Sequence, residues 1–209
     1  MLPLPMEVVE APEGGRPFFG FALPAVVAGI QRRLAAFGVH YIEGGFAGSN
    51  PKDAEFFARA QSELSQEAKQ KLVAFGSTRS KRSATADQDP QLRALVESGA
   101  PTACIVCKAS SWQTTDILGA SREDNLDMIS SSVAFLRKEG LKVHVDLEHF
   151  YDGFLGGRAA EGDSEYSLEC ACVAVAAGAE RPVERLGHGE VRLAVRPRPE
   201  ASYGPRPHS

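Results

Sequence analysis

Apolar runs with strand character recur along the chain, and the segments between them carry apolar residues at helical spacing. Four strands are predicted in this way, at Val39 to Phe46, Lys71 to Gly76, Thr102 to Cys107 and Leu141 to Phe150. Because strands alternate with helices, neighbouring strands should run parallel, joined by right-handed crossovers. The carboxyl ends of all four strands should then open on one edge of the sheet, where functional groups are expected.

The intervening helices are bounded by recognisable residues. Helices are predicted over Leu23 to Phe37, Asp53 to Lys69, Gln91 to Glu97 and Ser121 to Leu136. Asn50 and Asp89 each precede a proline, which is the usual order of an N-cap residue and the first helical position. Gly140 ends the last of these helices. The pattern as a whole is typical of an α/β fold built from βα units.

The fourth strand combines polar and apolar residues in strict alternation. His144, Asp146 and Glu148 should lie on one side, and the other side carries Val143, Val145 and Leu147. We expect the apolar side to meet the helices and the polar side to face a barrel interior. Carboxylates placed there without partners cost free energy, which chemistry could explain. The alternative is that Asp146 and Glu148 lie at a frayed strand end in water.

The segment Gly38 to Phe57, GVHYIEGGFAGSNPKDAEFF, joins a strand, a glycine-rich turn and a capped helix. It places Glu43 where the strand is expected to end, and α/β barrels assemble active sites at such strand ends. The turn could also hold a phosphate with its backbone amides. It lacks the lysine and hydroxyl residue of a P-loop, so we favour a role in shaping the mouth of the site.

Two cationic residues follow predicted strands. Lys108 comes after the third strand and could contact an anionic substrate. Arg79 follows the second and could clamp a carboxylate at two points. For Lys108 the commoner alternative is a solvated loop lysine, and Lys81 and Arg82 make a solvated basic loop around Arg79 an equal alternative.

Composition bounds the class of protein. The chain has 209 residues, 43% of them hydrophobic and 24% charged, with a net charge of -4. These values suit a globular domain and disfavour nucleic acid as a partner, and no apolar run reaches the roughly 20 residues that span a membrane. Acidic residues near the N-terminus disfavour a targeting segment, so we expect a cytoplasmic location. A complete (β/α)8 barrel, one arrangement of such βα units, usually needs about 250 residues, so a barrel built from this chain would be incomplete.

The cysteines and the C-terminal segment each carry a further expectation. Cys104 and Cys107 should point to opposite faces of a strand, which favours buried thiols over a zinc site. Residues 180–209 are rich in Arg and Pro, and we expect disorder there, with binding of an acidic partner as the weaker alternative. The expected organisation is an irregular segment at 1–22, a partial barrel at 23–179 and the tail.

The segments IEGGFAGSNPKDAEFF, KLVAFGSTR and VDLEHFYDGF resemble, in the same order, segments of citramalate synthases. These enzymes belong to the isopropylmalate synthase family, which is pyruvate carboxyltransferase-like and related to HMG-CoA lyases. The resemblance runs from about Leu23 to Gly153 and weakly to Ala179. It implies a (β/α)8 TIM barrel and an acyltransferase that condenses pyruvate with acetyl-CoA at a divalent metal, Mg or Mn, on a route to isoleucine.

The resemblance also implies roles for individual residues. Glu148 matches a glutamate that handles the substrate and its protons, and Glu43 matches one that borders the metal. Asp146 would support Glu148. The substrate-binding candidates are Arg79, Lys108 and His144.

Parts of the family pattern have no counterpart in this sequence. No LRDGxQ motif precedes Leu23 and no HxH pair follows, so we expect a truncated barrel that lacks the first strand and the last units, with no metal ligand assigned. Two interpretations stay open: an acyltransferase of the citramalate synthase type, or a catalytically inactive remnant that binds a partner. A partial barrel leaves sheet edges uncovered, which predicts self-association or poor solubility.

Overall fold

The computed structural model describes residues 29, 33–34, 37–155, 163–186 and 189–194. Its strands are β1 (Ile42–Phe46), β2 (Leu72–Ser77), β3 (Thr102–Lys108), β4 (Lys142–Glu148), β5 (Arg181–Leu186) and β6 (Gly189–Ala194). Its α-helices are α2 (Pro51–Glu63), α3 (Gln66–Gln70), α4 (Pro90–Glu97), α5 (Arg122–Lys138), α6 (Phe150–Phe154) and α7 (Asp163–Ala176). A 3-10 turn, η1, covers Ala86–Gln88, and a π-helix, η2, covers Gln113–Leu118.

The strands form one sheet in the order of the sequence, β1 to β6. The first five are parallel, and only the β5–β6 pair is antiparallel. The α/β class and the four predicted strands are therefore confirmed, as are the crossover helices between them. Parallel pairing between strands close in sequence is the arrangement of a (β/α) barrel.

Helix boundaries follow from side-chain caps. Asn50 accepts from the amides of Lys52 and Asp53 at the start of α2. The single helix expected from Asp53 to Lys69 is instead two, because the Ser65 side chain accepts from Ala68 N at 3.2 Å and begins α3. The helix expected over Leu23 to Phe37 lies mostly outside the described residues.

The segment after Ala179 differs from the expected disorder. Glu180 N donates to Val143 O at 2.8 Å, and β5 then pairs with β4 while β6 pairs with β5. A neighbouring strand offers backbone partners whatever the side chains are, so an Arg- and Pro-rich composition did not exclude pairing. Residues 1–22, 187–188 and 195–209 lie outside the described residues.

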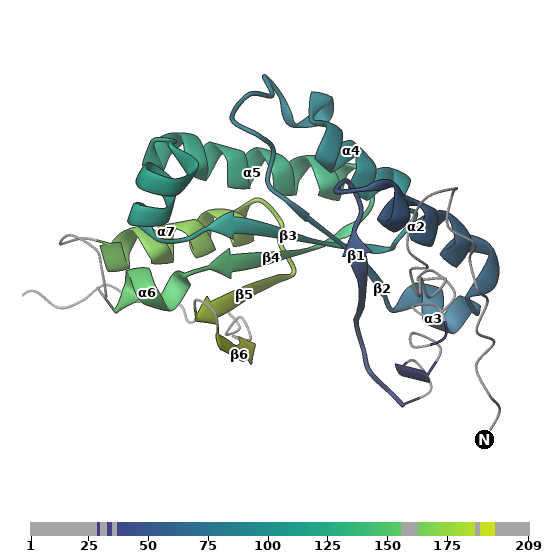
Figure 1. The fold of residues 1–209 in the computed structure, drawn as a ribbon. Coiled ribbons are helices and arrows are strands. Elements are labelled where there is room, and N and C mark those ends of the chain that lie inside the picture. The colour runs from purple at the N-terminus through teal and green to yellow at the C-terminus, as the bar shows by residue number, and fades with distance from the viewer. Residues whose placement is uncertain (1–28, 30–32, 35–36, 156–162, 187–188, 195–209) are drawn as a thin grey trace, which may run out of the picture.

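The helices pack on one face of the sheet and enclose the core. Figure 1 shows α5 and α7 on one side of β3 and β4. The residues that face them are fully buried and apolar: Ala103, Ile105, Val143, Val145 and Leu147. Alternation along the strands places the remaining side chains on the opposite face, which we call the inner face.

The sheet curls about its inner face. The ring of Tyr41, directly before β1, meets the ring of His144 on β4 edge-on, with 4.7 Å between centroids. The guanidinium of Arg181 on β5 lies over the same tyrosine ring at 4.9 Å. In a flat sheet, β1 and β4 would stand three strands apart, or about 14 Å. These contacts require a curved sheet, as in a barrel.

Gly44 allows α2 to pack closely on β1. A Cβ at this position would lie 2.5 Å from Phe56 Cε1 and 3.0 Å from Leu72 Cδ1. We expect Gly44→Ala to lower the free energy of unfolding by about 1–3 kcal/mol through overpacking, measured by urea denaturation. Gly48→Ala is the matched control, since its Cβ would meet Ala94 Cβ at 3.4 Å. Equal stability of the two variants would contradict this account.

Candidate functional site

The polar side of β4 forms the centre of the inner face. The register pairs Cys104 with His144, Val106 with Asp146 and Lys108 with Glu148, so these side chains share a face. His144 is 6% exposed and Asp146 is 1% exposed. The alternation predicted for β4 is confirmed, and the polar side chains lie on the face opposite the helix-covered core rather than at a frayed end.

Lys108 and Glu148 form an ion pair at the carboxyl ends of β3 and β4, between Lys108 Nζ and Glu148 Oε2. Their side chains are 27% and 34% exposed, so the pair is accessible without being fully hydrated. The backbone joins the same two strand ends, because Ala109 N donates to Glu148 O at 3.0 Å. This arrangement sets a carboxylate, a cation and the buried Asp146 at one edge of the sheet, where α/β barrels carry their chemistry.

His144 lies deeper, towards the amino end of the inner face. Burial and the nearby charges of Arg181 and Lys142 lower the pKa of His144 to about 4, against the opposing effect of Glu180. The imidazole is therefore neutral at pH 7. Its Nε2 is buried and has no hydrogen-bond partner among the described residues. Its ring packs on Tyr41, so the structure shows a packing role, and substrate binding by His144 stays a prediction.

The lowered pKa of His144 predicts a pH dependence of stability. An unfolded histidine takes up a proton near pH 6.5 and the folded one only near pH 4. Stability should therefore fall as the pH drops through this window. Between pH 7 and pH 5 we expect a loss of about 1–2 kcal/mol that His144→Leu removes and that His40→Gln, at an exposed histidine, retains. Urea midpoints at the two pH values measure it, and identical slopes in all three proteins would contradict it.

Arg79 is bound within the protein. Its Nε donates to Ser131 Oγ at 3.0 Å, its Nη1 donates to Ser83 O at 3.0 Å, and its Nη2 pairs with Asp127. Its backbone N also donates to Ser132 Oγ at 2.8 Å. Each guanidinium nitrogen thus has a partner: two of the contacts fix the loop after β2 to α5, and the third lies within the loop. Binding of a substrate carboxylate by Arg79 stays a prediction.

Glu43 was expected where the first strand ends, but it is the second residue of β1 and is exposed. Following the register across the sheet, Glu43 lies in the row of Val73, Thr102 and Lys142. Glu148 lies six residues beyond Lys142 on β4. The pairing therefore brings Lys108, and not Glu43, beside Glu148.

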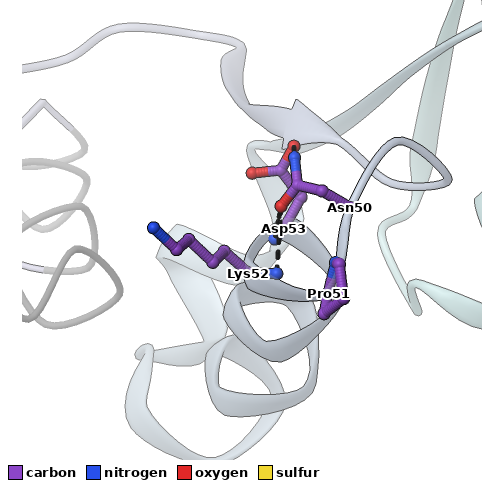
Figure 2. A pocket seen from close by; sticks show the side chains of 4 residues that line it. All are labelled: Asn50, Pro51, Lys52 and Asp53. Atoms are coloured by element: carbon purple, nitrogen blue, oxygen red, sulfur yellow. Dashed lines mark hydrogen bonds between the residues drawn. The ribbon is translucent and has the colours of Figure 1, made fainter. Parts of the chain in front are cut away.

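The polar groups of the turn before α2 form hydrogen bonds with one another. A hollow of about 510 Å³ is lined by Asn50, Pro51, Lys52 and Asp53. Figure 2 shows the side chains of these four residues at the start of α2. The two amides of the first turn already donate to Asn50 Oδ1. Asp53 Oδ2 accepts from Asn50 Nδ2 at 3.0 Å and from Ser49 Oγ at 2.9 Å. A carboxylate here repels anions, so these contacts disfavour the phosphate cradle considered above.

The sequence did not point to the polar residues beneath the end of β3. Asn125 on α5 and Ser167 on α7 are fully buried, and they donate to the backbone oxygens of Lys108 at 2.8 Å and Ala109 at 2.6 Å. One signal was available: Asn125 falls one turn before Ile129 on the apolar stripe of its helix. A polar residue at a core-facing position predicts a buried hydrogen-bond partner.

Metal binding and thiol chemistry receive no geometric support from the described part of the chain. It contains no group of three or more His, Cys, Asp or Glu residues placed to hold a metal ion. The described residues therefore provide no complete ligand set for the metal that the resemblance implies. Cys104 lies on the inner face and Cys107 in the core, as their spacing predicted, and both are buried and form no disulfide. None of the helices described is long and apolar enough to cross a membrane.

Known proteins resemble this chain in sequence and in fold. No family model matches it. The (R)-citramalate synthases of Streptomyces coelicolor and Sulfolobus acidocaldarius are each 41% identical to it over 151 residues, which are 72% of this chain. The same residues are 27% of each relative, so the chain spans about a quarter of the length of the curated relatives it matches.

Solved structures show the fold. The HMG-CoA lyase of Bacillus subtilis superposes with a TM-score of 0.55 at 15% identity, over 77% of this chain and 50% of that one. The hydroxymethylglutaryl-CoA lyase of Pseudomonas aeruginosa gives a TM-score of 0.56 at 17% identity. The curved parallel sheet is thus part of a (β/α) barrel. With 41% identity over most of its length, the chain is homologous to part of the (R)-citramalate synthases.

Proposed function

We propose that this chain takes part in acyl transfer of the citramalate synthase type, in which the acetyl group of acetyl-CoA is joined to pyruvate. The relatives named above supply the reaction class. The observation that carries the proposal is the Lys108–Glu148 pair at the ends of adjacent strands, on the inner face of a barrel-type sheet. It supplies a proton acceptor and a cation at the edge where barrel enzymes bind substrate.

The reaction divides into steps that these side chains suit. A base removes a proton from the methyl group of acetyl-CoA, and the resulting carbon attacks the keto carbon of pyruvate. The keto oxygen takes a proton and becomes a hydroxyl, and water then cleaves the thioester to release CoA. We assign proton transfer to Glu148, and to Lys108 we assign contact with the pyruvate carboxylate or the developing oxyanion.

Asp146 supports the pair from below. Its carboxyl group is buried two residues before Glu148 on the same face of β4. Glu43 stays a candidate for the border of a metal site. A divalent cation would polarise the keto group in this class of reaction. Because the described residues provide no ligand set, we derive no step through it.

The test is an assay of CoA thiol release from acetyl-CoA with pyruvate and Mg²⁺ or Mn²⁺, with citramalate identified by mass spectrometry. We expect release that requires pyruvate, and its loss in Lys108→Met. Lys52→Met is the matched control, because Lys52 is exposed at the start of α2. Release that is independent of pyruvate, or equal in the two lysine variants, would remove the proposal.

A further inference from the structure

The end of β3 is held by a buried polar network that no step above uses. Asn125 Nδ2 on α5 donates to Lys108 O at 2.8 Å and to Tyr166 Oη at 2.7 Å. Thr114 Oγ1 on η2 lies 3.1 Å from the same Tyr166 oxygen. Ser167 Oγ on α7 donates to Ala109 O at 2.6 Å. Side chains of α5 and α7 thus bind two consecutive backbone carbonyls, and η2 joins the network through Tyr166.

The burial of this network is unusual for groups so polar. Asn125, Thr114 and Ser167 are each 0% exposed, and Tyr166 is 2% exposed. Burial also raises the pKa of the Tyr166 hydroxyl, so it stays protonated. Apolar side chains of similar volume would fill the core at a lower desolvation cost. A buried polar group loses its hydrogen bonds to water and must form new ones in the protein to offset that loss. The polar groups instead fix the orientation of the backbone carbonyls to which they bind.

Those residues are Lys108 and the one that follows it. Fixing both carbonyls fixes the backbone from which the Lys108 side chain leaves β3, and Ala109 N in turn holds Glu148 O. The network and the ion pair therefore meet at the same two strand ends. From this geometry we infer that Asn125 and Ser167 are positioning residues, which set the Lys108 ammonium against the Glu148 carboxylate. This inference rests on the proposed function, because proton transfer by Glu148 and substrate contact by Lys108 both depend on the geometry of the pair.

The experiment measures how readily Lys108 is acetylated by an amine-reactive ester in the full chain, by peptide mass spectrometry. Lys52 in the same sample is the internal reference. Glu148→Gln shows the effect of a broken pair. In Asn125→Leu, which keeps the volume of the side chain, and in Ser167→Ala, we expect labelling of Lys108 to rise about two- to fivefold relative to Lys52.

Ser132→Ala is the matched control for general loosening. Ser132 lies on the same helix, is also 0% exposed, and holds the backbone of Arg79 rather than that of Lys108. It should lower the melting temperature and leave Lys108 labelling unchanged. Unchanged labelling in both network variants, or an equal rise in Ser132→Ala, would show a purely structural network and overturn the inference.

The two proposals can fail separately. If Glu148→Gln and the network variants raise Lys108 labelling but the protein releases no CoA, positioning stands and the acyl transfer falls. If CoA is released in a pyruvate-dependent manner but Lys108 labelling is unchanged in the network variants, acyl transfer stands and positioning falls. In an active protein, positioning further predicts that Asn125→Leu lowers kcat with little change in KM for acetyl-CoA, because the network touches neither substrate.

Discussion

Glu148→Gln is expected to lower pyruvate-dependent CoA release by about 10²- to 10⁴-fold, the usual contribution of a positioned acid or base. The amide keeps the shape of the side chain but cannot take up the proton. The variant should stay folded, because a partly exposed ion pair contributes only about 1 kcal/mol or less. Steady-state kinetics and a urea unfolding curve on the same preparation measure both effects.

A control variant and a double mutant test whether the loss of turnover in Glu148→Gln is specific to this pair. Glu139→Gln makes the same chemical change at an exposed residue at the end of α5 and should leave turnover unchanged. Lys108→Met and Glu148→Gln should be strongly non-additive when combined, because each removes the same pair. Turnover within about threefold of the parent chain in Glu148→Gln would exclude this carboxylate as the base.

Asp89→Ala should cause the largest loss of stability, about 2–4 kcal/mol in the free energy of unfolding. The carboxylate is 1% exposed and accepts four hydrogen bonds. Its donors are Gln91 N and Leu92 N at the start of α4, and Ser80 N and Ser83 Oγ in the loop after β2. Its removal leaves buried donors unpaired and frees the loop whose Ser83 carbonyl binds Arg79.

The pKa of Asp89 gives the sign of the pH dependence. Burial alone would raise this pKa, but the four hydrogen bonds together hold it below the ordinary value of 3.8. The ionised form is therefore favoured by folding, and its contribution is complete at neutral pH. It should be lost only as the pH falls below 3.8 and through the folded pKa. Asp89→Asn, which retains a capping oxygen, should cost less than Asp89→Ala, and an Asp89→Asn variant as stable as the parent chain at pH 7 would contradict a role for the charge.

Local patterns in the sequence were enough to predict much of the fold. The alternation of β4 identified which side chains leave the core, because successive residues of a strand must point to opposite faces. The caps Asn50 and Asp89, each followed by a proline, marked two helix starts, because a helix needs acceptors for its first amides close in sequence. These inferences held because their physical causes act over a few residues. The choice of Glu148 and Asp146 as inward-facing acids came from the same alternation.

Which side chains contact each other was decided by the tertiary structure. That Lys108 meets Glu148 and that Glu43 falls in the row of Lys142 depend on strand register. Arg79 meets Asp127 because α5 packs beside the loop after β2. Register is set by pairing between segments about 30–40 residues apart, which no local pattern encodes. The strand at Arg181–Leu186 shows the same limit, because its backbone pairs with β4 despite a composition that predicts disorder. The sequence by itself determined which residues could face inward, and packing of the sheet decided which of them meet.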